Sequence, residues 1–259
     1  MPWSFGRRRA VEKKSRVIAL TGLSFEARIA GGEAIISDGL QTSAILKSAV
    51  GQHSRGIISF GVCGGLAPDL QPGQWIVASS ILFRDEIHDT DRRWSERLLQ
   101  LLPGARYARI ASVDCPLPHG EPRALFYAST GAAVSDMESH FGARVAAASR
   151  LPFVACRVVL NPAHRKLPAA ALLKLKQGSP DLRAILRYVL AEPGQVRDLM
   201  RLAFDAAIAK ACLRQAKLLL GPNLGFPEPD ESFAGVPSRS VGQFAYATCE
   251  YLGPTPGQR

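Results

Sequence analysis

The stretch AVSDMESH, residues 133–140, leads from an apolar strand end directly into the start of a helix. It brings a thioether, Met137, and a carboxylate, Glu138, to that junction. A thioether packs well against the face of a sugar ring, and a carboxylate accepts hydrogen bonds from two neighbouring hydroxyls. In open α/β sheets, ligands gather beyond the carboxyl ends of the strands. The stretch therefore predicts an α/β fold with a sugar-binding edge.

The surrounding sequence alternates between strands and helices. Strands are expected at residues 16–21, 35–36, 56–60, 75–80, 107–113, 131–135 and 153–160. Helices are expected at residues 42–50, 92–102, 121–129 and 137–149, with a short one beginning at Ser24. Such alternation predicts a sheet with helices on both faces.

The chain of 259 residues fits one α/β domain with additions at its ends. Residues 1–15 are expected to form a flexible basic arm and residues 16–175 the catalytic domain. Residues 176–222 are expected to form a helical extension, and residues 223–259 an irregular tail rich in Pro and Gly. In the extension, apolar residues recur at helical spacing and basic residues fill much of the remainder. This face either packs on the domain, which we favour, or rests on a membrane or a partner.

The net charge is +10 and the isoelectric point is near 9.7. Contact with an anionic membrane surface and simple solubility are both open explanations of this charge. Nucleic-acid binding is not expected, because the basic residues do not interleave with stacking aromatic residues. No apolar run is long enough to span a membrane and no signal segment is recognisable, so a cytoplasmic protein is expected. The five cysteines have no metal-ligand spacing and are expected to be reduced thiols, without a metal or other cofactor.

Four predicted strand ends carry polar or glycine-rich sequence, namely residues 21–26, 61–65, 136–138 and 161. Their convergence at one edge is a stronger argument for a site than any single motif. The glycine turn is not a phosphate-binding loop of the Walker type, because no Gly-Lys-Ser/Thr follows it. Its glycines serve either a tight turn or a close approach of the backbone to a ligand.

Several of these segments resemble a known superfamily. GVCGGLAP at residues 61–68, with PGQWIV at 72–77, is similar to the glycine segment of bacterial methylthioadenosine/S-adenosylhomocysteine nucleosidases. DMES at 136–139 resembles the ribose-binding segment of the nucleoside phosphorylase and nucleosidase superfamily. DMESH together with RVV at 157–159, NPAHR at 161–165 and LPAAAL at 167–172 resembles the hopanoid-associated branch, the adenosylhopane nucleosidases, also called hopanoid-associated phosphorylases. The resemblance covers roughly residues 16–175.

The resemblance implies a three-layer α/β sandwich with a mixed central sheet. It implies that Glu138 holds the ribose hydroxyls, that Met137 packs on the sugar, and that Glu26 activates the attacking water. Without the resemblance, Glu26 would be interpreted as an acid that favours the first turn of a helix. The remaining substrate-binding residues implied by the resemblance are Gly61, Val62, Cys63, Gly64 and Cys115.

Asn161 departs from the family pattern. Adenine-specific relatives carry an Asp there, which protonates the leaving base, whereas Asn can donate a hydrogen bond but cannot act as a general acid. Three interpretations are open: a variant slowed so that substrate is trapped, a natural enzyme that prefers a 6-oxopurine, or a nucleoside-binding protein without turnover. The first is narrowly favoured, because the surrounding residues still suit an adenosine site.

The implied function is hydrolysis of an adenosine attached to a large apolar group, with adenosylhopane as the expected substrate. Water is favoured over phosphate as the nucleophile, because Val62 lies where a phosphorylase would use a hydroxyl group to bind phosphate. Arg28 is only a weak candidate for a phosphate-binding arginine. Phosphorolysis stays the second enzymatic interpretation. A homodimer with peripheral contact to the inner membrane surface is also expected, as a consequence of the family and the substrate.

Overall fold

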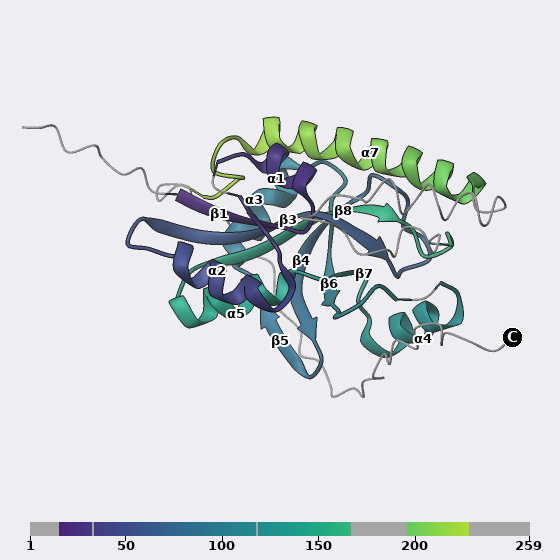
Figure 1. The fold of residues 1–259 in the computed structure, drawn as a ribbon, viewed down its shortest axis with the longest axis horizontal. Coiled ribbons are helices and arrows are strands. Elements are labelled where there is room, and N and C mark those ends of the chain that lie inside the picture. Colours follow the sequence, from purple (N-terminus) through teal and green to yellow (C-terminus); the bar gives the residue numbers. More distant parts are fainter. Residues whose placement is uncertain (1–15, 33, 118, 167–195, 228–259) are drawn as a thin grey trace, which may run out of the picture.

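A computed structural model of the chain describes residues 16–32, 34–117, 119–166 and 196–227 (Figure 1). The strands are β1 (Arg16–Thr21), β2 (Ile35–Ile36), β3 (Ser54–Gly65), β4 (Trp75–Phe83), β5 (Glu86–Asp89), β6 (Arg106–Ser112), β7 (Val134–Asp136) and β8 (Phe153–Asn161). The helices are α1 (Ser24–Ala30), α2 (Thr42–Ala49), α3 (Arg92–Leu101), α4 (Glu121–Thr130), α5 (Ser139–Ser149) and α7 (Val196–Leu220).

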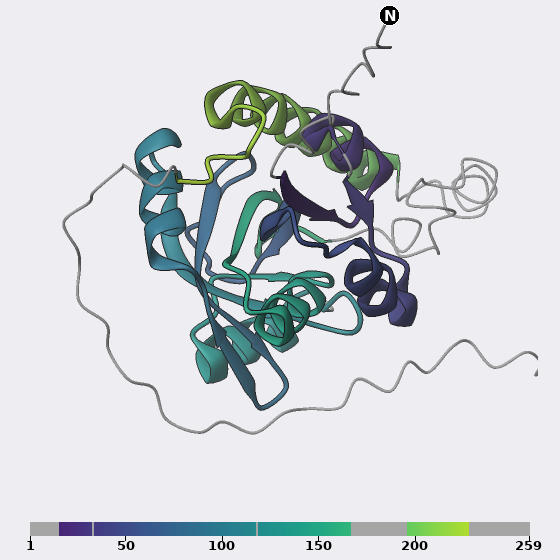
Figure 2. The ribbon, with the colours of Figure 1, turned by 90° about the vertical axis from the view of Figure 1, so that its left-hand side faces the viewer.

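The sheet is mixed. Its strands follow the order β2-β1-β3-β7-β6-β4-β5, and β8 pairs in parallel with β3 and antiparallel with β4. These pairings close a circuit, because β3 also reaches β4 through β7 and β6. Figure 2 shows the strands curling around the centre of the molecule.

Helices cover the sheet on both sides (Figure 1). α1, α3 and α7 pack on one side, where Trp94 and Leu213 belong to a buried apolar cluster. α2 and α5 pack on the other, where Leu46 and Val145 belong to a second cluster. The expected three-layer α/β sandwich with a mixed sheet and a C-terminal helix is therefore confirmed.

α7 rests on the sheet through one apolar stripe. Ala209, Leu213 and Ala216 are buried, and the helix contacts β8, α1 and α3. Of the two alternatives for this helix, packing on the domain thus holds for its buried stripe. The first part of the predicted extension lies outside the described residues, as do the basic arm and most of the predicted tail, and the domain boundaries stay predictions.

Two local differences from the expected elements bear on the site. β3 runs to Gly65, so the glycine segment is part of a strand and not a free turn. The strand β5, Glu86–Asp89, was not expected, because its short polar sequence has no apolar alternation; it forms by pairing with β4. The region of the described residues contains no helix that is long and apolar enough to cross a membrane.

Candidate active site

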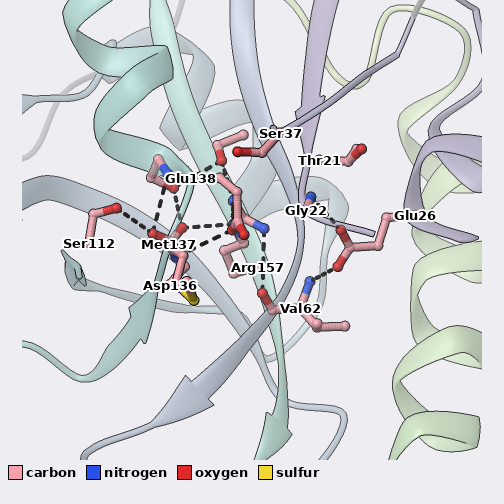
Figure 3. A network of polar contacts seen from close by, with 12 residues as sticks. Thr21, Gly22, Glu26, Ser37, Val62, Ser112, Asp136, Met137, Glu138 and Arg157 are labelled. Atoms are coloured by element: carbon pink, nitrogen blue, oxygen red, sulfur yellow. Dashed lines mark hydrogen bonds and ion pairs between the residues drawn. The ribbon is translucent and has the colours of Figure 1, made fainter. Parts of the chain in front are cut away.

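Arg157 of β8 is a buried cation that organises the acids at the strand ends (Figure 3). Its Nη2 lies 3.1 Å from Glu138 Oε2, and its Nε lies 3.0 Å from Asp136 Oδ2. The contact with Asp136 is an ion pair without hydrogen-bond alignment. Arg157 is fully buried, so this charge is available only to groups around it.

Hydroxyl groups fix the orientation of this cluster from below. Arg157 Nη2 donates to Ser59 Oγ at 2.5 Å, and Ser139 Oγ lies 2.9 Å from the same oxygen. Ser139 also donates to Asp136, and Ser112 Oγ donates to Asp136 Oδ1 at 2.9 Å. Asp136 thus serves to hold Arg157 and the start of α5, and Glu138 is left at the open side of the cluster.

His140 has a structural environment. Its Nδ1 lies 2.8 Å from Ser112 Oγ, and its ring stacks on Phe83 with the centroids 3.9 Å apart. Burial lowers the pKa of His140 to about 4, so the ring is neutral near pH 7. This fits a packing role below the site.

Glu26 lies in α1, whose first turn follows β1. Its Oε2 accepts from the main-chain N–H of Gly22 and of Leu23, each at 2.8 Å, and its Oε1 accepts from Val62 N–H at 2.7 Å. The bond to Leu23 is the reach of a third-position acid back to the helix N-cap. Glu26 thus caps its helix and also faces the glycine strand β3, and its activation of water stays a prediction.

Two glycines let the acids approach the backbone so closely. A Cβ at Gly22 would lie 2.5 Å from Glu138 Oε1, and a Cβ at Gly61 would lie 2.5 Å from Glu26 Oε1. Since Gly22 N–H also binds Glu26, this one residue separates the two carboxylates. Glu26 and Glu138 are therefore neighbours across a glycine, although they are far apart in the sequence.

Burial without enough positive charge raises the proton affinity of both acids. The pKa of Glu26 is raised above its usual value by burial, although Arg157 and the three amides oppose the shift. Burial likewise raises the pKa of Glu138 to about 7, against the pull of Arg157 and with the charges of Asp136 and Glu26 adding to the rise. A carboxyl group whose pKa is near 7 is suited to exchange protons at physiological pH.

The other predicted residues are distributed around this centre. Met137 is 39% exposed beside Glu138, where its side chain is accessible to a ligand. Val62 binds Glu26 through its N–H and accepts from Arg157 Nη1 through its carbonyl at 3.4 Å. Gly64 pairs with Ser135 of β7 on one side and with Asn161 on the other, and so links β7 to the end of β8.

Cys63 and Cys115, the two cysteines among the predicted substrate-binding residues, lie outside this polar cluster. Cys63 packs in the core, where burial raises the pKa of its thiol well above the usual value. Cys115 is half-buried in the loop after β6.

Asn161 ends β8 and is buried. Its side-chain amide satisfies its neighbours only when the oxygen faces Arg123 of α4, accepting from Nη1 at 3.3 Å and Nη2 at 3.0 Å. Asn161 also lines a cavity of about 430 Å³ at the side of α7, with His164 and Arg165 among the other lining residues. Glu26 and Glu138 are not among the lining residues. The carboxylates and the cavity lie along the same strand ends, because Glu26 binds Val62 and Asn161 pairs with Gly64.

Sequence reasoning assigned no role to Gly22, Arg123 or Arg157. Arg157 had a usable signal, since an arginine inside the apolar run FVACRVVL must find a buried partner. Arg123 had none, because it lies in an ordinary amphipathic helix and its importance arises from tertiary contacts. The close approach at Gly22 is likewise a long-range property.

The fold and the site together place carboxylates at the ends of the strands of a mixed α/β sheet. The model of the phosphorylase superfamily matches residues 40–191, more than half of the chain, and the chain belongs to this superfamily. It is thus an enzyme of the class that comprises nucleosidases and nucleoside phosphorylases. The matched span includes Glu138 and Asn161, whereas Glu26 precedes it.

Solved structures with the same fold have low sequence identity to the chain. A 5′-methylthioadenosine/S-adenosylhomocysteine nucleosidase from Helicobacter pylori, in complex with butyl-thio-DADMe-Immucillin-A, is 13% identical with a TM-score of 0.54, over 81% of this chain and 99% of that one. The futalosine hydrolase of the same organism is 12% identical with a TM-score of 0.55, over 81% and 97%. An aspartate-to-asparagine variant of the Helicobacter pylori nucleosidase with 5′-methylthioadenosine in its active site is 13% identical with a TM-score of 0.54, over 80% and 98%. No curated protein matches the chain.

Proposed function

We propose that the chain hydrolyses the N-glycosidic bond of an adenosine that carries a large apolar group, with adenosylhopane as substrate and ribosylhopane and adenine as products. The observation that carries the proposal is the pair of carboxylates, Glu26 and Glu138, on the two sides of Gly22. One acid can serve a water molecule and the other the ribose, as cleavage through an oxocarbenium-like sugar requires.

The residues divide the reaction between them. Glu138, once ionised, accepts hydrogen bonds from the ribose hydroxyls while Met137 packs on the sugar. Glu26 accepts a proton from the attacking water while the oxygen of that water forms a bond to C1′. The C1′–N9 bond breaks with its electron pair passing to the purine, and Asn161 donates a hydrogen bond to N7. The proton that completes adenine comes from solvent, because an amide has none to transfer.

The comparisons support a nucleosidase. The similar structures are named as nucleosidases and a hydrolase, and one of them contains 5′-methylthioadenosine, an adenosine with a small apolar substituent. The hopanoid substrate rests on the motif resemblance from residues 136–172. A homodimer in the cytoplasm, at the inner membrane surface, is part of the same proposal.

The outer face of α7 supports contact with lipid. Met200 is 69% exposed and Phe204 is 67% exposed, and the two lie one helical turn apart. Arg197 lies three residues before Met200, and Arg201 directly follows it. Apolar side chains flanked by cations are typical of helices that rest on anionic bilayers. Since α7 also borders the cavity at Asn161, a substrate held in the bilayer would approach the site along this helix.

Sedimentation with vesicles tests this contact. The full chain is expected to bind vesicles containing anionic phospholipid, and a variant with Met200→Ser, Phe204→Ser, Arg197→Gln and Arg201→Gln is expected to stay in the supernatant. Lys210 is a less suitable target, because its ammonium already lies over the ring of Phe25 at 4.8 Å. Unchanged binding of the variant would contradict the lipid contact and leave hydrolysis untouched.

Release of adenine tests the enzymatic proposal. Adenosine with a long alkyl chain on its 5′ carbon is incubated with the chain with and without phosphate, and the base and sugar products are separated. Adenine and free ribose derivative without phosphate are expected, and Glu138→Gln is expected to lower kcat/KM by about 10²-fold or more. Formation of a ribose 1-phosphate that requires added phosphate would establish phosphorolysis instead.

Asn161 favours one second candidate, a nucleoside-binding protein without turnover. A related nucleosidase in which Asp is replaced by Asn has been solved with 5′-methylthioadenosine in its active site. Tight binding of the alkyl adenosine by calorimetry, with no adenine released over hours, would favour this candidate over the enzyme.

A further inference from the structure

Arg123 is a buried cation beside the site, and its hydrogen-bond partners among the described residues are neutral. It is only 4% exposed, and its Nε donates to the carbonyl of Leu117 at 3.2 Å while Nη1 donates to that of Pro162 at 3.4 Å. Within the ranges that the structure describes, no carboxylate forms an ion pair with it. Buried charges are normally paired, so the positive charge is left for something that arrives with negative charge.

The same guanidinium fixes the amide of Asn161. The amide oxygen accepts from Nη1 and Nη2, so the amide nitrogen is turned away from Arg123. In the opposite orientation, N–H groups would face N–H groups. Asn161 therefore offers a ligand in its cavity hydrogen-bond donors, and not the acceptor oxygen.

We infer that Arg123 is a positioning residue that holds Asn161 with its N–H donors toward the leaving purine, and that its positive charge, acting through Asn161, stabilises the purine as an anion. This inference rests on the proposed nucleosidase function. Under this inference, Asn161 contributes to catalysis as a hydrogen-bond donor and is not an impaired replacement for a general acid.

The chemistry balances without a general acid. Water gives its oxygen to C1′ and its proton to Glu26, and the C1′–N9 electron pair leaves with the base. The base then carries one negative charge, spread over its ring nitrogens, and takes its proton from solvent after departure. Preorganised donors and charge at the place where negative charge develops are the largest common contribution to enzymatic catalysis. Burial lowers the pKa of Arg123, but from a value so high that the guanidinium stays charged.

The arrangement sets a condition on residue 161. A carboxyl group in place of the amide would face Arg123 at the same short distances, and an adjacent cation favours the ionised form. An ionised Asp can neither donate a proton nor stabilise an anionic base. Asn161→Asp is therefore expected to lower activity as long as Arg123 is present, and to raise it once Arg123 is removed.

The test is a double-mutant cycle measured as adenine release from the 5′-alkyl adenosine across pH. Arg123→Met is expected to lower kcat by about 10²-fold with a smaller change in KM. Asn161→Asp is expected to lower kcat by about 10-fold or more. The double variant is expected to exceed both and to lose activity at alkaline pH as its Asp ionises, whereas the unmodified chain keeps its rate there.

Arg109→Met is the matched control, since Arg109 also donates to a main-chain carbonyl of α4, that of Thr130 at 2.9 Å, but belongs to β6. Should Arg123→Met not fold, Asn161→Asp alone still decides: a gain of about 10-fold or more with an alkaline loss of activity would overturn the inference. An Arg123→Met variant as active as the control would overturn it as well. Absence of adenine release from the unmodified chain would refute the proposed function itself, which is a different result.

Discussion

Gly22 carries more of the site than its lack of a side chain suggests. Its N–H binds Glu26, and the space where a Cβ would stand is filled by the carboxylate of Glu138. A residue that must be glycine for close approach is as informative about a site as a reactive side chain.

Gly22→Ala should therefore impair nucleoside binding. The new methyl group would lie 2.5 Å from Glu138 Oε1 and force the carboxylate away from its place beside Arg157. We expect at least a tenfold rise in Kd, equivalent to about 1.4 kcal/mol, measured by calorimetry with the 5′-alkyl adenosine. Gly51→Ala is the control, because nothing lies within 4 Å of a Cβ at Gly51.

If Glu138 binds the ribose as proposed, nucleoside affinity should depend on pH near neutrality. Its pKa is raised to about 7 by burial, and only the ionised form accepts hydrogen bonds from both ribose hydroxyls. Affinity is expected to be high above pH 7 and to fall as the pH is lowered through it. Calorimetric titration over this range should show the fall in the unmodified chain and a flat, weak affinity in Glu138→Gln; an equal slope in both would assign the effect to another group.

At the scale of single elements, the two faces of α7 differ, because one is buried against the sheet and the other is exposed. Its buried stripe holds it on the sheet, and its outer face presents Met200 and Phe204 to the surroundings. The helix can thus serve as a contact surface without leaving its place beside the cavity at Asn161.

Substitutions on the two faces of α7 should separate these functions. Leu213→Ala removes a fully buried side chain and is expected to lower the free energy of unfolding by about 2–5 kcal/mol. Leu218→Ala, at a side chain that is 84% exposed, is expected to change it by less than about 0.5 kcal/mol. Urea denaturation measures both, and equal effects would mean that the buried stripe does not anchor the helix.

At the scale of the whole molecule, one buried arginine supports three acids. Arg157 lies at 3.0 Å from Asp136 and 3.1 Å from Glu138, and its charge also opposes the rise that burial causes in the pKa of Glu26. We therefore expect the stability of the fold, and not only the site, to depend on this cation.

Arg157→Met should destabilise the whole domain in a pH-dependent way. Removing one partner of a buried ion pair costs about 3–5 kcal/mol, and Glu26 and Glu138, whose pKa values are already raised, take pKa values further above those of the unfolded chain. Groups with raised pKa values stabilise the fold at low pH and lose that contribution as the pH rises. The loss in melting temperature should thus be smaller near pH 5 than near pH 8; Arg84→Met, which breaks an exposed pair with Asp114, should cause little change at either pH.

The parts of the site that share a local pattern could be predicted from sequence, and the parts made by tertiary contact could not. Met137 and Glu138 follow from a strand that ends at a helix start, and the strand ends converge because neighbouring strands end at one edge. The pairing of Arg123 with Asn161 joins residues 38 positions apart on different elements, and no local periodicity encodes it. The same limit applies to β5, which depends on its partner β4.

The circuit of strands has a consequence during synthesis of the protein. β8 is the last strand along the described chain, and it pairs with both β3 and β4 while supplying Arg157 and Asn161. A nascent polypeptide still lacking this segment would hold its acids without their counter-charge, and the gap between β3 and β4 would stay unfilled. Competence to bind a nucleoside should therefore emerge abruptly, and only after the ribosome has released the closing segment.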